Sequence, residues 1–202
     1  MIAFIGDVHR AFDRLTRLVE KLPAGVGAIV QVGDLGLRPS DLAPTAAGLR
    51  LSRPVYFIGG NHDYEPWFRG VHAPTELTPN LIYVPRGAVL ELDGRRIGFL
   101  GGGDSVIDRA IRCEGVDWWP EERVTAAEVA RFGGGTRVDI LVAHTPPAPV
   151  YAVLRFRPDP SSCEVERAWD LLGRPTVVCG HLHQARAVGA VRVLAELEVL
   201  LL

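Results

Sequence analysis

The chain has 202 residues, of which 48% are hydrophobic and 23% charged, and its 22 basic and 24 acidic side chains give a formal charge of -2. We expect a single domain over residues 1–202, because a chain of this length buries about two-thirds of its unfolded surface. This near-neutral balance lacks the polybasic character of proteins that bind nucleic acid or anionic membranes. Lys21 is the single lysine, which argues against lysine-based catalysis and against a Gly-Lys-Ser/Thr phosphate loop.

The cysteines favour a reducing compartment. Cys113, Cys163 and Cys179 are scattered and form no CxxC pair, which argues against a disulfide framework and against a thiolate zinc site. None of them has an arginine six residues later, as a cysteine phosphatase would require. No apolar run approaches membrane-spanning length, and the first residues lack a basic leader. We therefore expect a cytoplasmic protein that does not enter a membrane.

Short apolar runs alternate with helical patterns along most of the chain. The runs, typical of strands buried on both faces, cover residues 2–5, 28–32, 55–58, 140–143 and 176–179. Helical patterns cover residues 11–22, parts of 39–50, 125–132 and 164–172. In the first of these helical patterns, leucine and valine recur with the spacing of an amphipathic helix.

The middle and the end of the chain look different. Residues 81–84, 88–92 and 95–100 are predicted strands, and Asp93-Gly94 predicts a hairpin turn between the last two. Residues 191–202 are predicted as one strand, half-buried because glutamates alternate with apolar residues. The fold class is therefore α/β, and we expect a four-layer α/β/β/α sandwich in which two mixed β-sheets are flanked by helices.

Residues 101–122 have no clean periodicity. Three glycines open this segment, and it also contains Asp108, Arg109, Arg112, Trp118 and Trp119. Long irregular segments inside compact domains usually serve function. An arginine here can clamp a phosphate and a tryptophan can stack on a base; the alternative, which we favour for the tryptophans, is that they anchor the segment to the core.

Metal-ligand chemistry follows each of the five apolar runs. The side chains on offer are Asp7, His9, Asp34, Asn61, His62, Asp63, His144, His181 and His183. In α/β sheets ligands bind beyond the carboxyl ends of the strands. Carboxylates and imidazoles without thiolates suit a catalytic transition-metal site. Only one of the six histidines, His72, lies outside this set, and we expect a structural or surface role for it.

The motifs, in this order, resemble those of the calcineurin-like metallophosphoesterase superfamily, in its small single-domain bacterial type. They are Asp7-x-His9, Gly33-Asp34, Gly60-Asn61-His62-Asp63, His144 and Gly180-His181-x-His183. They span residues 7 to 183, and five motifs in register are a far more specific signal than any one of them.

The resemblance implies a binuclear metal centre. One metal would be held by Asp7, His9 and His183, the other by Asn61, His144 and His181, and Asp34 would bridge both. A hydroxide shared by the metals would attack phosphorus, His62 would protonate the leaving oxygen, and Asp63 would orient His62. Two cations about 3.5–4 Å apart clamp both oxygens of such a displacement. Mn²⁺ is the metal we favour, while Fe, Zn, Co and Ni suit the same ligands.

The predicted function is metal-dependent hydrolysis of phosphomonoesters or phosphodiesters. The partner would be a small phosphate ester, with nucleotides among the candidates, and the oligomeric state is left open. Candidate substrate contacts are Arg10, Arg109 and Arg112, with Arg155 and Arg157 as weaker ones. Arg10 stands where many relatives have glycine, and its alternative role is that of a surface arginine at the start of a helix. The competing hypotheses are a non-catalytic metal-binding interaction scaffold on the same fold and a mononuclear metal hydrolase.

Overall fold

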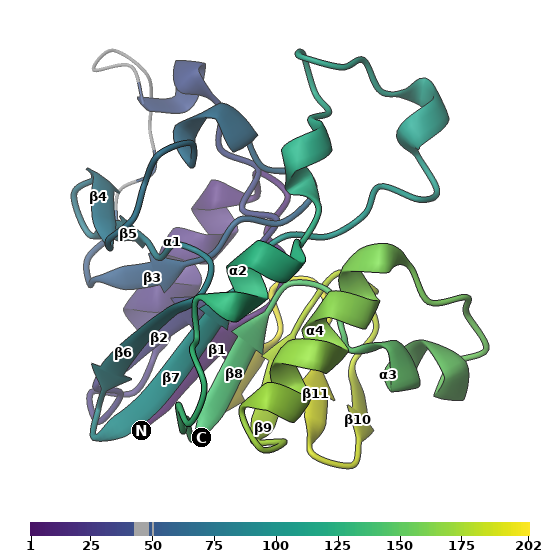
Figure 1. Ribbon diagram of the computed structural model, residues 1–202. Coiled ribbons are helices and arrows are strands. Elements are labelled where there is room, and N and C mark those ends of the chain that lie inside the picture. The colour runs from purple at the N-terminus through teal and green to yellow at the C-terminus, as the bar shows by residue number, and fades with distance from the viewer. Residues whose placement is uncertain (43–48, 50) are drawn as a thin grey trace.

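Two six-stranded mixed sheets form the centre of the computed structural model, which describes residues 1–42, 49 and 51–202 (Figure 1). The first sheet has the order β12 (Val199–Leu201), β1 (Ile2–Ile5), β2 (Ala28–Gln31), β3 (Val55–Phe57), β5 (Leu81–Tyr83) and β4 (Thr75–Thr78). The second has the order β10 (Arg186–Val188), β11 (Val191–Val193), β9 (Thr176–Cys179), β8 (Ile140–Ala143), β7 (Arg95–Leu100) and β6 (Ala88–Leu92). Central strands run parallel and each edge strand pairs antiparallel with its neighbour.

The layers follow from the two-residue period of the strands. In β1, Ile2 and Phe4 pack in a core between the sheets together with Phe99 of β7. Ala3 and Ile5 of the same strand pack in a second core, which includes Leu15 and Val19 of α1 (Phe12–Lys21). Both faces of the strand are buried, which explains why the sequence shows a continuous apolar run.

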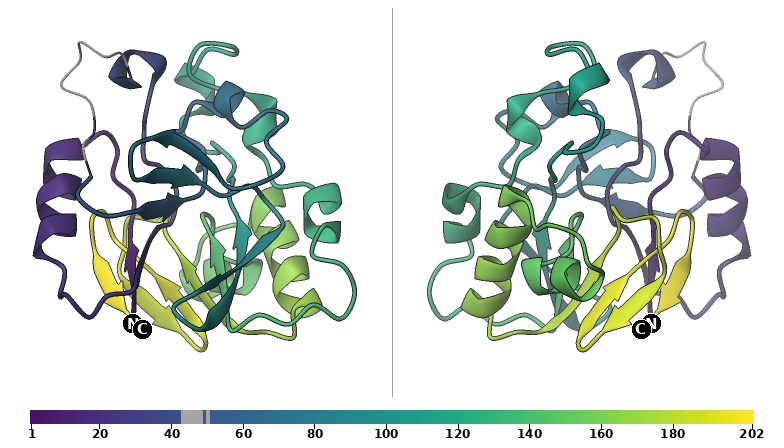
Figure 2. Two further views of the ribbon diagram at one scale, coloured as in Figure 1. Left: turned by 90° about the vertical axis from the view of Figure 1, so that its left-hand side faces the viewer. Right: turned by 90° about the vertical axis from the view of Figure 1, so that its right-hand side faces the viewer.

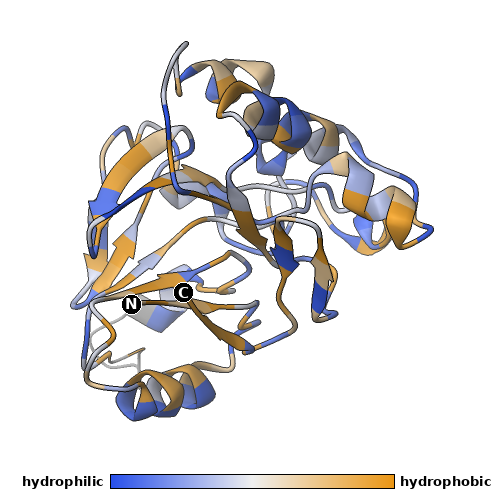
Figure 3. Cartoon of the chain, turned by 90° about the horizontal axis from the view of Figure 1, so that it is seen from below, coloured by the Kyte–Doolittle hydropathy of each residue, from blue (hydrophilic) through white to orange (hydrophobic). Residues whose placement is uncertain are grey.

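A third core lies on the outer face of the second sheet, under α2 (Ala126–Ala130) and α4 (Pro160–Leu171). Figure 2 shows α1 on one side of the paired sheets and these helices on the other. The strands in Figure 3 are mostly apolar, while the helices carry both hydrophobic and hydrophilic residues. The predicted four-layer α/β/β/α architecture is thus confirmed.

Capping residues set the starts of the two outer helices. Asp159 accepts a hydrogen bond from the Ser162 amide at 2.7 Å, so α4 begins at Pro160, four residues before the predicted start. Thr125 and Glu128 form a capping box at α2. The predicted helical pattern over 39–50 gives a 3₁₀ turn, η1 (Pro39–Leu42), and its continuation over 43–48 and 50 lies outside the described residues.

The prediction of one strand over residues 191–202 is wrong. The chain leaves the second sheet after β11 and enters the first sheet as β12. The turn between them has Leu197 at φ 53°, and the Ala195 amide donates to Glu198 Oε2 at 2.7 Å. The alternating glutamates therefore belong to a turn, and period-two alternation over a few residues did not distinguish a turn from a strand.

Among the α-helices and strands of the described residues, three were not predicted. The edge strands β4 and β10 are short and largely exposed, so they lack an apolar run. Helix α3 (Ala148–Val153) begins directly after two prolines and lasts six residues. By contrast, β6 and β7 have the predicted bounds, and Asp93 and Gly94 both have positive φ, as a two-residue hairpin turn requires.

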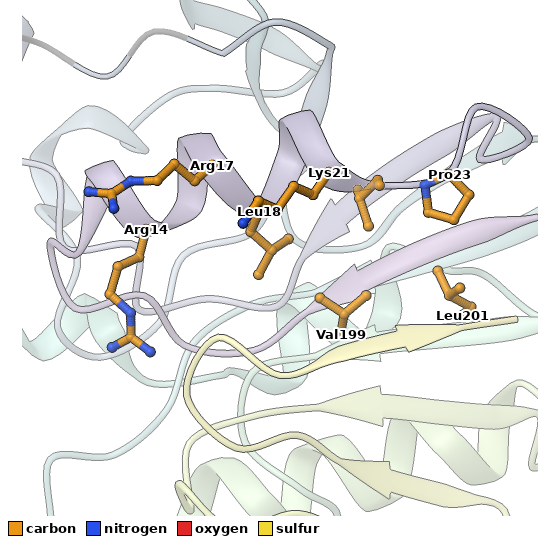
Figure 4. Close-up of a pocket in the computed structure, with 8 residues that line it drawn as sticks. Arg14, Arg17, Leu18, Lys21, Pro23, Val199 and Leu201 are labelled. Carbon is orange, nitrogen blue, oxygen red and sulfur yellow. The ribbon is translucent and has the colours of Figure 1, made fainter.

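Within the described residues, no helix is long and apolar enough to span a membrane. A groove of about 560 Å³ lies between α1 and β12, lined by apolar side chains and by Arg14, Arg17 and Lys21 (Figure 4). Its lining contains no acidic side chain and no histidine. It therefore lacks the carboxylates and imidazoles of a metal site.

Candidate metal centre

The nine predicted site residues come from loops that follow β1, β2, β3, β8 and β9. The first three strands belong to the first sheet and the last two to the second. Segment 101–122, which follows β7, rises in Figure 1 at the end of the molecule opposite the two termini. The sheets lie face to face, so loops from both meet at one rim.

Four side chains form a first group of candidate ligands. One ligand atom from each of Asp7, His9, Asp34 and His183 lies within 4.8 Å of the others. His9 Nε2 and His183 Nε2 are 2.9 Å apart, and His183 Nε2 is 3.2 Å from Asp7 Oδ2. This cluster contains the three predicted ligands of one metal together with the predicted bridge.

A second group surrounds the amide oxygen of Asn61. His144 Nε2 and His181 Nδ1 each lie 3.0 Å from Asn61 Oδ1. These three residues are the predicted ligands of the other metal. The structure therefore brings His144 and His181 together around one oxygen atom of Asn61.

Asp34 faces both groups. Its Oδ2 lies 3.7 Å from His9 Nε2, and its Oδ1 lies 3.4 Å from His144 Nε2. The carboxylate is 1% exposed. A buried carboxylate with one oxygen toward each group has the geometry of a bridging ligand, since an anion between two close cations reduces their repulsion.

The hydrogen bonds of His144 leave its Nε2 directed at the site. Its Nδ1 lies 3.1 Å from the Val32 carbonyl oxygen, which fixes Nδ1 as the protonated nitrogen. Burial disfavours the imidazolium, but the Asp34 carboxylate outweighs this and raises the pKa of His144 to about 9. In return, the neighbouring imidazoles hold the pKa of Asp34 below its usual range despite its burial.

The two histidines after β9 differ in their environment. Burial lowers the pKa of His181 to about 3, and the nearby charge of His144 adds to this effect. Its imidazole is therefore neutral and can act as a ligand. The hydrogen bond to Asp7 raises the pKa of His183, which is less buried.

Four of the candidate ligands have a left-handed backbone. His9, Asp34, His181 and His183 have φ between 45° and 69°. Left-handed backbone is uncommon outside glycine and costs about 1–3 kcal/mol per residue, although Asp and His tolerate it better than most residues. Such strain clusters at functional sites because the surrounding structure must impose it.

Two glycines leave room for the carboxylates. A methyl group at Gly60 would overlap the Asp34 carboxylate and amide, and one at Gly180 would overlap the Asp7 carboxylate. The backbone of residue 181 lies next to the Asp7 carboxylate, and the His181 amide donates a hydrogen bond to Asp7 Oδ2 at 2.9 Å. These glycines explain the Gly-Asn-His-Asp and Gly-His motifs physically.

His62 lies beside the first group, with its ring centroid 5.2 Å from that of His9. Its backbone amide donates to Asp34 Oδ1 at 2.8 Å, and its side chain is 37% exposed. Burial lowers the pKa of His62. The carboxylate nearest its ring nitrogen is that of Asp108, with Oδ2 3.5 Å from Nε2, a contact that spacing along the sequence did not indicate.

Asp63 contacts backbone amides. It accepts hydrogen bonds from Gly60 at 2.8 Å and from Gly36 at 2.6 Å. These bonds connect the loop after β2 to the loop after β3. Burial and the nearby Asp34 charge raise the pKa of Asp63 to about 6. Asp63 therefore braces the loops that carry Asp34 and His62.

The three candidate substrate arginines all have protein partners. Arg10 forms a bidentate pair with Asp41 at 2.8 and 2.9 Å. Arg109 stacks on Trp118 with its guanidinium carbon 3.6 Å from the ring centroid. Arg112 donates to the Asn61 carbonyl at 2.9 Å and to Ser105 Oγ and the Asp117 carbonyl.

Two tryptophans and one histidine that the sequence analysis named lie outside the two groups of candidate ligands. Trp118 and Trp119 are buried, which agrees with the anchoring role favoured for them. His72 is exposed and belongs to neither group of ligands.

Sequence reasoning missed the polar residues that hold Asn61. The Asn61 amide donates to Ser105 Oγ at 3.2 Å. Glu122 in turn accepts from the Ser105 amide at 2.7 Å and from its hydroxyl at 3.0 Å. These contacts point the Asn61 oxygen at His144 and His181. Ser105 and Glu122 carry no motif, and only the folded segment 101–122 reveals their role.

The donor set fits divalent transition cations. Carboxylate, amide and imidazole donors from both sheets converge on two adjacent points, and no cysteine is among them. A mixed oxygen and nitrogen set suits Mn²⁺, Fe²⁺, Zn²⁺, Co²⁺ or Ni²⁺. Burying carboxylates without a compensating positive charge costs free energy. A bound cation would supply that charge where the acceptor atoms converge.

The comparisons with known proteins agree with this geometry. No curated protein matches the chain. The model of the calcineurin-like phosphoesterase family matches residues 1–185, which contain both groups of candidate ligands and His62. Metal-dependent hydrolysis of phosphoesters is the activity that this family membership indicates. This match, together with the fold and the candidate metal ligands, shows that the chain belongs to the calcineurin-like phosphoesterase family.

Proposed function

We propose that the protein is a binuclear metal-dependent phosphoesterase. The observation that carries the proposal is the position of Asp34 between two groups of ligands, with one oxygen 3.7 Å from His9 and the other 3.4 Å from His144. A structural site would need one metal and a closed set of ligands, whereas paired cations next to an open cleft are typical of phosphoryl chemistry.

Seven side chains would hold the cations. Asp7, His9 and His183 form one set; Asn61, His144 and His181 form the other; and Asp34 is shared. We favour Mn²⁺ because three of the seven side chains offer carboxylate or amide oxygens as ligands. When bound, the pair of cations would lower the pKa of water and neutralise the oxygens of the phosphate.

His62 would act as the general acid. Its side chain is partly exposed to the cleft, next to the ligand group that includes His9. Burial lowers its pKa, so the free imidazole is neutral at pH 7. A bound phosphate anion would raise that pKa and let His62 carry the proton that it gives to the leaving oxygen. Asp63 would keep the His62 loop in register with Asp34 through its bonds to Gly60 and Gly36.

The substrate would be a small phosphomonoester or phosphodiester, with nucleotides among the candidates. A cavity of about 560 Å³ opens beside the ligand groups and includes Asp34, Asn61 and His62 in its lining. This volume is within the usual range for small-molecule sites.

The substitution Asp34→Asn tests the proposal. We expect it to reduce bound metal from two ions to one or none per chain and to abolish Mn²⁺-dependent release of 4-nitrophenol from an aryl phosphodiester, since a neutral amide cannot bridge two dications. The control is Asp13→Asn, which removes an exposed carboxylate in the first turn of α1. Metal content would be measured by elemental analysis, and EDTA should stop the wild-type reaction.

Three results would contradict the proposal. If the wild-type protein binds two metals but hydrolyses no phosphoester with any of the five cations, the result supports the hypothesis of a non-catalytic metal-binding scaffold. If Asp34→Asn keeps full activity, the bridging carboxylate is not part of the reaction. A single bound ion in the active wild-type protein would favour a mononuclear hydrolase.

A further inference from the structure

The cleft next to His62 has an unusual lining for a site that receives phosphate. Its acidic side chains are those of Asp34, Asp104, Asp108 and Asp159. Among the described lining residues the only arginine is Arg157, and no lysine is present. The proposed metal ligands explain Asp34, so the remaining carboxylates need a separate account.

Asp108 is the carboxylate closest to the proposed acid. Its Oδ2 lies 3.5 Å from His62 Nε2, and its side chain is 28% exposed. The cation nearest to it is Arg112, with 3.7 Å between Nη1 and Oδ2. Arg112 also faces Glu122, at 3.8 Å from Oε2. Two carboxylates thus share one guanidinium, and Asp108 keeps negative charge toward the position where the phosphate would contact His62.

The carboxylates of Asp104 and Asp159 already have partners within the protein. Asp104 Oδ1 is 2.5 Å from Arg123 Nε. Asp159 caps α4 through its bond to the Ser162 amide. Asp108 is therefore the carboxylate whose charge a substrate would meet.

The wall of the cleft is apolar. Val106, Ile107, Phe156 and Leu182 line it, and the first three are 67%, 98% and 47% exposed. Val106 and Ile107 come from segment 101–122, while Phe156 follows α3. Exposed apolar side chains at the edge of a polar site normally mark a surface that an apolar group covers.

We propose that this cleft selects phosphodiesters whose second ester group is apolar, and that Asp108 discriminates against phosphomonoesters. The inference rests on the proposed function and narrows its substrate class. A phosphomonoester carries close to two negative charges above a pKa of about 6, whereas a diester carries one. The second charge of the monoester would face Asp108, while the second ester group of the diester is neutral and can pack on Val106 and Ile107.

The test compares bis(4-nitrophenyl) phosphate with 4-nitrophenyl phosphate at pH 8, using the Mn²⁺-loaded protein. Both substrates release the same leaving group, and they differ in charge and in the presence of a second ester group. We expect a higher kcat/KM for the diester in the wild-type protein. Asp108→Asn should raise kcat/KM for the monoester by roughly tenfold, because one unit charge a few ångströms away is removed in a partly screened site. The diester value should change by about threefold or less, since a monoanion is repelled about half as strongly as a dianion.

Two variants serve as controls. Glu114→Gln removes a negative charge from an exposed side chain of the same segment that does not line the cleft, and it should leave the ratio of the two substrates unchanged. Asp108→Glu retains the charge and should retain the preference for the diester. Metal content measured on each variant separates a change in selectivity from a loss of cations.

The apolar wall has its own test. Ile107→Ser should raise KM for bis(4-nitrophenyl) phosphate and leave KM for methyl 4-nitrophenyl phosphate nearly unchanged, because the methyl group is too small to cover the wall. Ile111→Ser is the matched control, since Ile111 is 87% exposed in the same segment and does not line the cleft. Equal effects of the two variants would contradict the assignment of the wall.

The outcomes separate this inference from the proposed function. A wild-type protein that hydrolyses monoesters faster than diesters would overturn the inference and leave the phosphoesterase intact. Equal losses on both substrates in Asp108→Asn would show that Asp108 only positions His62, which would also overturn it. If the metal-loaded wild-type protein hydrolyses neither substrate, the proposed function and the inference fail together.

Discussion

At the scale of single residues, the candidate centre depends on side chains whose backbone the chain holds in uncommon conformations. His9, Asp34, His181 and His183 are left-handed, and Asp63 offsets part of this cost by accepting hydrogen bonds from two neighbouring loops. His62 lies beside them with its ring partly exposed in the lining of the cleft.

Replacing His62 tests its role as the general acid. His62→Ala should keep two metals per chain and lose about 10²–10⁴-fold in kcat on a substrate with an alkyl leaving group. The loss should be much smaller with 4-nitrophenol as leaving group, because that anion departs without a proton. The measurement is kcat for a matched pair of diesters that differ in the leaving group. His72→Ala, on an exposed histidine outside the site, is the control, and equal losses on both diesters would exclude general-acid catalysis by His62.

At the scale of elements, the irregular segment 101–122 is tightly bound to the rest of the molecule. Trp118 and Trp119 are buried, and the Arg112 side chain is only 6% exposed. Arg112 joins the segment to the Asn61 loop through its bond to the Asn61 carbonyl. The segment also contains two 3₁₀ turns, η3 (Arg109–Ile111) and η4 (Pro120–Glu122), and backbone hydrogen bonds such as that from the Trp118 amide to the Cys113 carbonyl at 3.2 Å. Buried tryptophans and the Arg112 side chain therefore hold one wall of the cleft against the Asn61 loop.

Removing the Arg112 guanidinium should loosen this wall. Arg112→Gln leaves the Glu122 carboxylate buried without its cation, and breaking one partner of a buried ion pair costs about 3–5 kcal/mol. We expect a lower free energy of unfolding by urea and faster amide hydrogen exchange within residues 101–122. Arg109→Gln, which removes a guanidinium stacked on Trp118 at an exposed position, should cost about 0.5–1 kcal/mol. Equal stability of the Arg112 variant and the wild-type protein would show that Arg112 does not hold the segment.

At the scale of the whole molecule, the centre lies where the two sheets meet. The first sheet carries Asp7, Asp34 and Asn61, and the second carries His144 and His181. The core between the sheets, which contains fully buried Phe4 and Phe99, therefore sets the distance between the two halves of the site. A buried ion cluster adds a polar connection beside this core.

That cluster contains Arg86, which is 6% exposed and contacts Glu65 at 3.3 Å and Glu128 at 3.1 Å. It also donates to the Glu121 carbonyl at 2.8 Å and to the Arg123 carbonyl at 3.0 Å. Burial raises the pKa of Glu65 to about 7, even though Arg86 acts in the opposite direction.

The raised pKa of Glu65 predicts a dependence of stability on pH. The folded protein binds this proton more tightly than the unfolded chain, so the contribution of Glu65 is greatest below the ordinary glutamate pKa of 4.5 and is lost as pH rises to about 7. The loss should be about 3 kcal/mol, since one pKa unit corresponds to about 1.4 kcal/mol. Glu65→Gln should remove this slope.

The measurement is the free energy of unfolding in urea from pH 4.5 to pH 8, with EDTA present so that metal binding does not contribute. The quantity to compare is the difference between the Glu65→Gln variant and the wild-type protein at each pH. Glu121→Gln is the control, because Glu121 forms an exposed pair with Arg69 and should leave the slope unchanged. A pH-independent difference for Glu65→Gln would show that Glu65 is ionised over the whole range.

Much of the fold and of the candidate centre could be predicted because the signals are local. The apolar runs, the Asp93-Gly94 turn and the donor residues that follow each strand are properties of short segments. The same reasoning failed for residues 191–202, where Leu197 has positive φ and the chain changes sheet. It also missed α3, β4 and β10, which are short or exposed and depend on neighbouring elements for their stability. The extent of the domain, residues 1–202, stays a prediction.

By itself the sequence determined the α/β class, the positions of most strands and the chemical type of the candidate metal ligands. Hydrophobic periodicity and residue type can be recognised within short stretches of consecutive residues. The tertiary structure decided which donors meet. His9 and His183 are 174 positions apart, and His144 reaches Asn61 across 83 positions. It also decided that Arg112 binds backbone carbonyls and that Asp108 lies beside His62. These contacts arise from the packing of two sheets and an irregular segment, and no local pattern encodes a distance between residues so far apart in the chain.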